Sequence, residues 1–260
     1  MSYENLIVEV ADGIATISVN RPKALNALNE GVLSDLIAAF SAAATNPEVK
    51  GVLLTGAGDR AFVAGADIAA MKTMTPMEAD TFCQLGHRCM RLIETFDKPV
   101  IAAVNGFALG GGCELALSCD FIYASKAAKF GLPEVNLGIF PGFGGTQRLM
   151  RLVGRGVAKE MVFTADILPA EDAKTIGLVN KIFEPDQLLS AAKETLKKIF
   201  AKGPVAVKLS KRVMNEGCEL PLAAALALEQ AQFPLVFASE DRVEGVSAFL
   251  EKRPAVFKGK

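Results

Sequence analysis

The sequence predicts an α/β fold in which short strands alternate with helices, followed by a helical C-terminal region. Runs rich in β-branched residues alternate with stretches of helical periodicity, and from Asp186 onward no convincing strand is found. The chain has 260 residues, of which 51% are hydrophobic, enough to bury one large core. Strands that alternate with helices favour a mostly parallel sheet with crossover helices.

The first expected elements are a hairpin and a capped helix. Residues 6–10 and 14–19 are β-rich runs separated by the turn sequence Ala-Asp-Gly. Asn29 can cap a helix whose apolar residues recur at helical spacing between 33 and 40. This helix is expected to end near Asn46-Pro47, because proline disfavours helical backbone in the residue before it.

The next expected elements continue the alternation. Residues 51–55 form an expected strand that leads into a glycine-rich loop, and residues 76–95 form an expected helix. Residues 99–104 are expected to be a buried strand, a helix begins at Gly111-Gly112, and residues 121–124 form a further short strand.

The last part of the chain is expected to be helical. Asp186 caps a predicted helix that stops at Gly203-Pro204, and further helical stretches follow to the end. We therefore predict a core over residues 1–200 and a helical region over residues 201–260. The second region is rich in Ala, Leu and Phe, which suits packing on the core or on another subunit.

Composition excludes several classes of protein. Lys and Arg number 28 against 29 Asp and Glu, so no global positive field exists to hold nucleic acid or an anionic membrane. The N-terminal residues lack the basic start and long apolar run of a secretory signal. The most apolar stretch, residues 99–119, contains four glycines and Glu114, which favours a protein interior over a membrane span.

The cysteines and the single histidine carry no recognisable chemistry. Five cysteines without a Cys-x-x-Cys pair argue against a disulfide framework and against a structural zinc site, so we expect no metal. Reduced, mostly buried thiols in a cytoplasmic protein are the expected state. His87 lies in a helix-like stretch with no catalytic signature and is expected to be structural.

One glycine-rich segment matches part of a dinucleotide-binding fingerprint. Gly56-x-Gly58-x-x-Ala61 follows an expected strand, but the residues after it do not open a long amphipathic helix. An NAD-binding oxidoreductase is therefore an alternative that this partial pattern alone supports.

A second glycine-rich segment, residues 105–114, lies between an expected buried strand and an expected helix. Three glycines at a helix start let ligand atoms approach N–H groups that have no partner within the helix. Together with the helix dipole, such groups suit an oxygen that becomes negative during a reaction. Tight packing of the helix on the sheet explains the same glycines equally well.

Two acidic residues occur among apolar neighbours. Glu114 falls in the first turn of the expected helix, and Glu134 follows in the sequence Phe-Gly-Leu-Pro-Glu. A favourable acid near a helix start and an ordinary surface carboxylate are the simpler explanations. If the two met in apolar surroundings, they would push their pKa values apart and leave one protonated and one ionised. Such a pair suits the addition of water to a carbon–carbon bond, or its removal.

Over essentially its full length the chain resembles the enoyl-CoA hydratase/isomerase (crotonase) superfamily. The ordered matching segments are Arg21-Pro-Lys-Ala-Leu-Asn-Ala-Leu28, Ala61-Phe-Val-Ala-Gly-Ala-Asp67, Asn105-Gly-Phe-Ala-Leu-Gly-Gly-Gly-Cys-Glu-Leu115, Phe130-Gly-Leu-Pro-Glu-Val-Asn-Leu-Gly138, Pro141-Gly-Phe-Gly-Gly-Thr-Gln-Arg148 and Ser247-Ala-Phe-Leu-Glu-Lys-Arg253. The resemblance implies a spiral of ββα units with a C-terminal helical trimerisation region, usually assembled as a dimer of trimers.

The resemblance also implies a reaction, the reversible syn hydration of a 2-trans-enoyl-CoA in fatty acid metabolism, with a short acyl chain expected. The backbone N–H groups of Ala66 and Gly111 would form the oxyanion hole for the thioester oxygen. Glu134 would exchange the proton at the α-carbon, and Glu114 would position and activate water at the β-carbon. The acyl-CoA is the substrate, and no metal or redox cofactor is implied.

Further residues are expected to contact CoA or to close the pocket. By resemblance these are Lys23, Ala24, Leu25, Ala64, Ala66, Asp67, Ile68, Gly111, Phe233 and Lys252. The sequence departs from many hydratases at Leu132, where they have Gln, and this leaves the substrate assignment open. Enoyl-CoA isomerisation, hydration of a cyclic dienoyl-CoA and decarboxylation are alternatives within the superfamily. RNA binding, known for some relatives, lacks an obvious stacking platform here.

Overall fold

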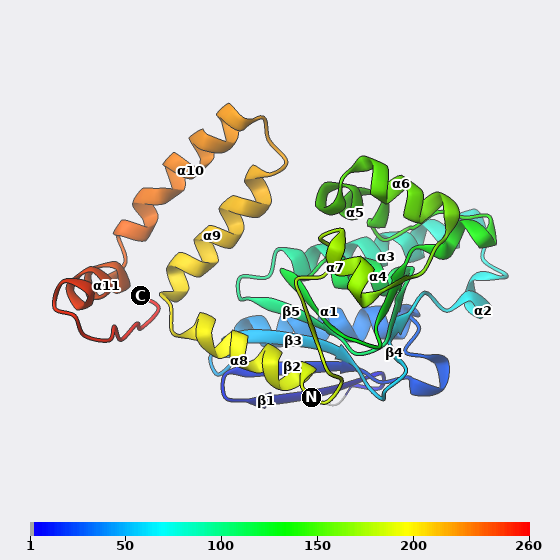
Figure 1. The fold of residues 1–260 in the computed structure, drawn as a ribbon, viewed down its shortest axis with the longest axis horizontal. Coiled ribbons are helices and arrows are strands. Elements are labelled where there is room, and N and C mark those ends of the chain that lie inside the picture. The colour runs from blue at the N-terminus through cyan, green and yellow to red at the C-terminus, as the bar shows by residue number, and fades with distance from the viewer. Residues whose placement is uncertain (1–2) are drawn as a thin grey trace. The chain divides into compact units, whose positions relative to one another are not determined.

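The computed structural model describes residues 3–260, and Figure 1 shows the order of its elements along the chain. The described chain divides into two compact units. The first extends to Phe96 and resumes over Val100–Lys193, and the second comprises Asp97–Pro99 and Glu194–Lys260. The division falls inside α8 (Leu188–Phe200), whereas the expected boundary lay at the end of that helix.

The larger sheet of the first unit has the order β1-β2-β3-β5-β7-β10. Its strands are β1 (Leu6–Ala11), β2 (Ile14–Val19), β3 (Gly51–Gly56), β5 (Val100–Val104), β7 (Phe121–Ser125) and β10 (Lys181–Phe183). Only β1 and β2 pair antiparallel, as the expected hairpin, and all other neighbours are parallel. The predicted mostly parallel sheet is therefore confirmed.

A second, smaller sheet has the order β4-β6-β8-β9. Its strands are β4 (Ala61–Ala64), β6 (Phe107–Leu109), β8 (Lys129–Gly131) and β9 (Leu168–Pro169), and β9 alone pairs antiparallel. The pairs β3 and β4, β5 and β6, and β7 and β8 each contribute one strand to each sheet. This repetition is the predicted ββα spiral. The second strand of each pair was not predicted from the sequence, because these strands are short and lie next to glycines.

The first unit carries helices that begin where the sequence predicts. Asn29 caps α1 (Glu30–Thr45) by accepting a bond from Val32 N at 2.9 Å. Thr75 and Glu78 form a capping box at α3 (Pro76–Glu94), and α4 (Gly111–Leu117) starts at the predicted glycines. The remaining elements of this unit are η1 (Pro22–Ala24), α2 (Ile68–Met71), η2 (Pro133–Leu137), α5 (Gly145–Val153), α6 (Arg155–Thr164) and α7 (Ala170–Thr175).

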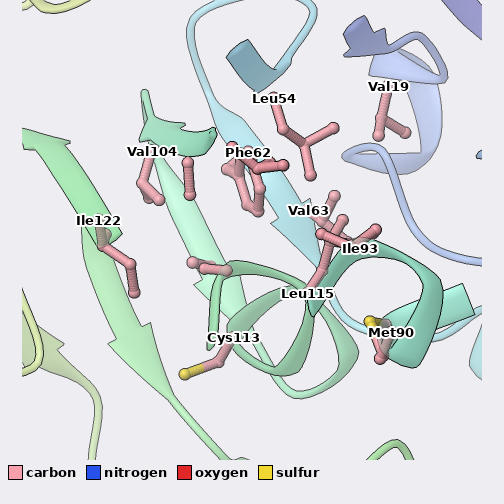
Figure 2. Close-up of a cluster of buried hydrophobic side chains, with 14 of the residues drawn as sticks. Val19, Leu54, Phe62, Val63, Met90, Ile93, Val104, Cys113, Leu115 and Ile122 are labelled. Atoms are coloured by element: carbon pink, nitrogen blue, oxygen red, sulfur yellow. The ribbon is translucent and has the colours of Figure 1, made fainter. Parts of the chain in front are cut away.

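The core of the first unit brings both sheets together with α3 and α4. Figure 2 shows a cluster of buried side chains from these elements, among them Val19, Leu54, Phe62, Val63, Met90, Ile93, Val104, Cys113, Leu115 and Ile122. Burial of this apolar surface is the main favourable term that holds α4 against the strands.

The second unit is helical in its described residues, as predicted. It contains the end of α8 and the helices α9 (Pro204–Gly217), α10 (Leu222–Phe237) and α11 (Glu240–Leu250). Within residues 3–260 no single helix is long and apolar enough to cross a membrane. By length and composition, α10 and α11 pass only as a pair bent by 78°.

None of the five cysteines takes part in a disulfide. Cys89 and Cys113 are buried, Cys83 and Cys119 are partly buried, and Cys218 is exposed in the second unit. The expectation of mostly buried thiols is wrong for Cys218, which follows the exposed end of α9.

The loop after β2 is tied to β4 by one buried side chain, Asn26. Its Nδ2 donates to Ala57 O at 3.0 Å and Ala61 O at 2.8 Å, and its Oδ1 accepts from Arg21 N at 2.9 Å. Its backbone has φ of 61°, a left-handed conformation that asparagine tolerates better than most residues. Asn26 therefore fixes the path of residues 21–28 beside β4.

Replacing Asn26 with Ala is expected to lower the free energy of unfolding by about 2–3 kcal/mol, since it leaves buried backbone groups without partners. Denaturant unfolding measures the loss. Asn46→Ala is the matched control. That side chain accepts a solvent-exposed bond from Glu48 N, and its loss is expected to cost about 0.5 kcal/mol. Equal costs for the two variants would contradict the role given to Asn26.

Candidate active site

The first unit contains a cavity of about 450 Å³. It is lined by Ala64, Gly65, Ala66, Ile68, Met71, Ala79, Phe82, Cys83, Leu109, Gly110, Gly111, Glu114, Pro133, Glu134, Leu137, Gly138, Ile139, Phe140, Gly142 and Phe143. Most of these are apolar, and the two carboxyl groups in the lining belong to Glu114 and Glu134. The cavity thus brings together the two acids singled out from the sequence.

Glu114 lies in the first turn of α4 and is only 1% exposed. Its Oε1 accepts bonds from Phe143 N at 2.8 Å and Gly145 N at 2.7 Å. Burial raises the pKa of this carboxyl, while the two amide donors and the charge of Arg148 oppose the rise. Two backbone amides and a nearby positive charge therefore stabilise the carboxylate form of Glu114, although the side chain is buried.

Glu134 lies in η2 and has a different environment. Burial, and then the charge of Glu114, raise the pKa of Glu134 to about 7. Its Oε2 is buried and has no hydrogen-bond partner among the described residues. A Cβ on Gly110 would lie 2.9 Å from Glu134 Oε1, so this carboxyl group sits directly against the start of α4. The charge of Glu114 thus acts on Glu134 in the expected direction, and the expectation that the two pKa values move apart stays a prediction.

Backbone amides line the same cavity. The first bond within α4 runs from Glu114 N to Gly110 O at 3.0 Å, so the Gly111 amide has no acceptor inside the helix. Ala66 forms a parallel bridge with Leu28, and the two bonds of that bridge use Leu28 N and Asp67 N. The bridge therefore does not use the amide of Ala66. Ala66 and Gly111 both line the cavity, as the oxyanion proposal requires.

Gly112 shows why the helix start is rich in glycine. A Cβ at this position would lie 1.9 Å from Val63 O, closer than any side chain allows. Gly110 has φ of 49° and leaves room for the Glu134 carboxyl. Tight helix–sheet packing and close approach to the cavity, the two explanations considered for these glycines, therefore apply at neighbouring positions.

The residues expected to contact CoA divide into three groups. Ala64, Ala66, Ile68 and Gly111 line the cavity, whereas Lys23, Ala24, Leu25 and Asp67 do not. The loop that carries Lys23 is nevertheless attached beside it, because Ala64 N donates to Leu25 O at 3.0 Å and Arg21 pairs with Asp67 at 3.1 Å. Phe233 in α10 and Lys252 after α11 belong to the second unit, and their expected contacts stay predictions.

Leu132, the departure from the common hydratase pattern, does not line the cavity. It precedes η2, is fully buried and belongs to the hydrophobic core. Its apolar side chain is therefore accounted for by packing.

The partial dinucleotide pattern has no matching structure. After Gly56-x-Gly58 the chain enters β4, a strand, whereas a dinucleotide fingerprint requires a helix. Within residues 3–260, no three His, Cys, Asp or Glu side chains gather as a set of metal ligands.

Sequence reasoning missed the groups that hold Glu114. Phe143 and Gly145 act through backbone amides, which leave no side-chain signal, and Arg148 acts from one turn further along α5. The segment Pro141 to Arg148 was among the matches to the superfamily, which was the one available sign of its importance.

The cavity is mostly apolar and holds two carboxyl groups, the buried one of Glu114 and the partly buried one of Glu134, with Ala66 and Gly111 in its lining. The family model described as enoyl-CoA hydratase/isomerase matches residues 9–260. The chain belongs to this family.

Relatives agree with this placement. The chain is 53% identical over 257 residues to a crotonyl-CoA hydratase of Syntrophomonas wolfei, covering 99% of each. It is 51% identical over 253 residues to a short-chain-enoyl-CoA hydratase of Clostridium acetobutylicum, covering 97% of each. The crystal structure of an enoyl-CoA hydratase from Bacillus anthracis superimposes with a TM-score of 0.95 at 39% identity, covering 99% of this chain and 100% of that one. The crotonase-like fold predicted from the sequence is thus confirmed.

The coupling between the two acids can be measured directly. Glu114→Gln is expected to lower the pKa of Glu134 from about 7, because the Glu114 charge contributes to the rise. The value stays above the ordinary 4.5, since burial is the larger cause. A ¹³C-carboxyl NMR titration follows the change. Glu171→Gln removes a charge from α7 outside the cavity lining and is the control. Identical Glu134 titrations in the two variants would contradict the coupling.

Proposed function

We propose that this chain is an enoyl-CoA hydratase that acts on short-chain substrates such as crotonyl-CoA. It adds water reversibly and with syn geometry to a 2-trans-enoyl-CoA and forms the 3-hydroxyacyl-CoA. The observation that carries the proposal is the pair Glu114 and Glu134 in one apolar cavity. Identity above 50% to proteins named crotonyl-CoA hydratase and short-chain-enoyl-CoA hydratase supports the substrate class.

In the proposed mechanism, Glu114 holds and activates the water that attacks the β-carbon. The amides of Phe143 and Gly145 leave the second carboxyl oxygen available to accept a water proton. Glu134 supplies the proton at the α-carbon. A pKa of about 7 suits a group that gives and takes a proton near neutral pH in the two directions of the reaction.

The amides of Ala66 and Gly111 would bind the thioester oxygen as it gains negative charge. Donors aimed in advance at such an oxygen contribute on the order of 10²–10³ in rate each. The hydroxyl of the water ends on the β-carbon and its proton passes to Glu114, while the α-carbon receives the proton of Glu134. Return of a proton from Glu114 to Glu134 restores both acids, so that one water is added in each turnover. Because no hydride or electron moves, the reaction calls for no redox cofactor.

Binding and assembly complete the proposal. The backbone at Lys23, Ala24, Leu25, Asp67 and Ile68 would bind CoA beside the cavity. Phe233 and Lys252 would close over the acyl chain or the CoA, in this or a neighbouring subunit. A homohexamer built as a dimer of trimers, and a cytoplasmic location, are the expected assembly and compartment.

The two acids are tested by substitution. Glu114→Gln and Glu134→Gln are each expected to lower kcat for crotonyl-CoA by at least about 100-fold with little change in CoA binding, since each loses a proton-transferring group. Loss of absorbance at the enoyl-thioester band measures the rate. Glu171→Gln serves as the control and is expected to match wild type. If Glu114→Gln and Glu134→Gln both hydrate crotonyl-CoA at nearly the wild-type rate, the proposed mechanism is wrong.

Product analysis separates the proposal from its alternatives. Hydration yields a 3-hydroxyacyl-CoA, isomerisation a shifted double bond, and decarboxylation a product that has lost CO₂. A panel of linear and cyclic enoyl-CoA substrates with identified products distinguishes these reactions and also measures the preferred chain length.

The oxyanion hole is tested by vibrational spectroscopy. The carbonyl stretch of a bound, unreactive acyl-CoA is expected at lower frequency than in solution, because two N–H donors weaken the C=O bond. Isotope-edited infrared difference spectra with a ¹³C label at the thioester carbon measure the shift. CoA lacking the acyl group is the spectral blank, and an unshifted band would contradict the assignment of Ala66 and Gly111.

A further inference from the structure

The orientation of Glu114 depends on a short segment before α5. Both of its amide donors, Phe143 N and Gly145 N, lie in residues 143–145. Any displacement of this segment would therefore also move the carboxylate that is proposed to hold the attacking water.

Arg148 of α5 also binds this segment. Its Nη1 donates to Phe143 O at 3.1 Å, so the residue that donates to Glu114 through its N–H accepts from Arg148 through its carbonyl. A Cβ at Gly144 would lie 2.2 Å from the same Nη1, and Gly144 has φ of 104°. The segment is thus built closely around the guanidinium.

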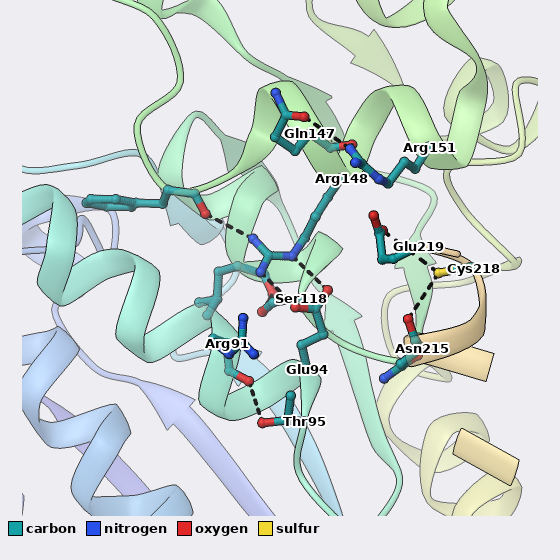
Figure 3. A network of polar contacts seen from close by, with 12 residues as sticks. Arg91, Glu94, Thr95, Ser118, Gln147, Arg148, Arg151, Asn215, Cys218 and Glu219 are labelled. Carbon is teal, nitrogen blue, oxygen red and sulfur yellow. Dashed lines mark hydrogen bonds and ion pairs between the residues drawn. The ribbon is translucent and has the colours of Figure 1, made fainter. Parts of the chain in front are cut away.

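The guanidinium is itself fixed by Glu94, the last residue of α3. Nε and Nη2 of Arg148 donate to the two carboxylate oxygens at 3.0 and 2.9 Å, the two-point geometry that Figure 3 shows. The Arg148 side chain is only 17% exposed. A partly buried two-point pair of this kind holds its members far better than an exposed ion pair.

The helix α3 holds the segment at a second point. Cys83 Sγ donates to Gly142 O at 3.0 Å, one residue before Phe143. The segment is therefore attached to α3 both directly and through Arg148, and α3 serves as its rigid support.

We propose that Arg148, fixed by Glu94, is a positioning residue for the hydration reaction and acts on Glu114 through residues 143–145. The inference rests on the proposed function. Arg148 does not line the cavity, so it influences substrate only through the carboxylate. A planar guanidinium can satisfy Glu94 and Phe143 O together, whereas a lysine ammonium is a single point charge.

Several other titratable or charged groups lie near Glu114 or near the segment that holds it. These are Cys83 and His87 of α3, Cys113 of α4, Glu134 of η2 and Arg148 of α5. Of these, Arg148 alone supplies a positive charge that lowers the pKa of Glu114. Its removal is expected to raise that pKa, so the acidic limb of the kcat profile should move to higher pH.

The main variant is Arg148→Met, which keeps much of the stem and removes the charge. It is expected to lower kcat for crotonyl-CoA by about 100-fold, the cost of a misplacement near 1 Å, while KM stays close to wild type. The acidic limb of its kcat–pH profile moves to higher pH.

Arg148→Lys keeps the positive charge but loses the planar, two-point hydrogen bonding of the guanidinium. Its kcat should therefore fall, while the acidic limb of the kcat–pH profile stays where it is in wild type. Arg151→Met, from the same helix, removes an arginine that bonds Gln147 and is the matched control.

A readout independent of activity separates this proposal from the proposed function. Amide hydrogen exchange at residues 143 and 145 is expected to accelerate in Arg148→Met and not in Arg151→Met, since both amides are protected by Glu114. If the wild-type protein hydrates no enoyl-CoA, the proposed function is wrong. Amide exchange at residues 143 and 145 would then still show whether Arg148 holds this segment.

Two results would overturn the positioning role. One is that Arg148→Met and Arg151→Met have the same kcat, the same acidic limb of the kcat–pH profile and the same amide exchange at residues 143 and 145. The other is exchange that accelerates evenly over the whole first unit, which indicates a general loss of stability. If Arg148→Met fails to fold, Arg148→Lys and Glu94→Gln carry the same comparison, with smaller expected losses of kcat.

Discussion

The contact of α4 with β4 decides where the reactive groups lie. No side chain fits between Gly112 and the carbonyl of Val63, so the helix approaches the strand at backbone distance. This places the Gly111 amide at the cavity wall and Glu114 less than one turn further along. Because Ala66 lies two residues after the end of β4, the same contact helps to bring the two residues of the proposed oxyanion hole to one cavity. A substitution that pushed α4 outward would move donors and carboxyl together.

The two cavity carboxyl groups have different surroundings, and the proposed chemistry depends on this difference. Glu114 is nearly inaccessible to solvent but receives two amide donors and the nearby charge of Arg148. Glu134 has a buried oxygen without a partner and a pKa raised to about 7. An acid that is solvated by fixed dipoles suits the binding of water, and one poised near neutral pH suits proton exchange. The apolar walls supply the desolvation on which both depend.

Much of the framework could be predicted because it depends on local patterns. The Asn29 cap, the hairpin turn before Ile14 and the helix start at Gly111 are each determined by residues close in sequence. The second sheet could not be predicted in this way. Its strands β4, β6 and β8 have four residues or fewer and are stabilised by pairing with one another across distant parts of the chain. Short segments of that kind carry too little periodicity to be separated from loops.

The candidates for the proposed chemistry could be chosen from the sequence alone, because Glu114 and Glu134 are carboxyl groups set among apolar residues, and their motifs match one family. That the two share a cavity and that both have raised pKa values follows from the fold, since burial and charge coupling depend on distances between segments that local sequence does not encode. The tertiary structure alone also revealed Phe143, Gly145 and Arg148 as the groups around Glu114. Backbone amides look alike in every sequence, and their direction is set by packing.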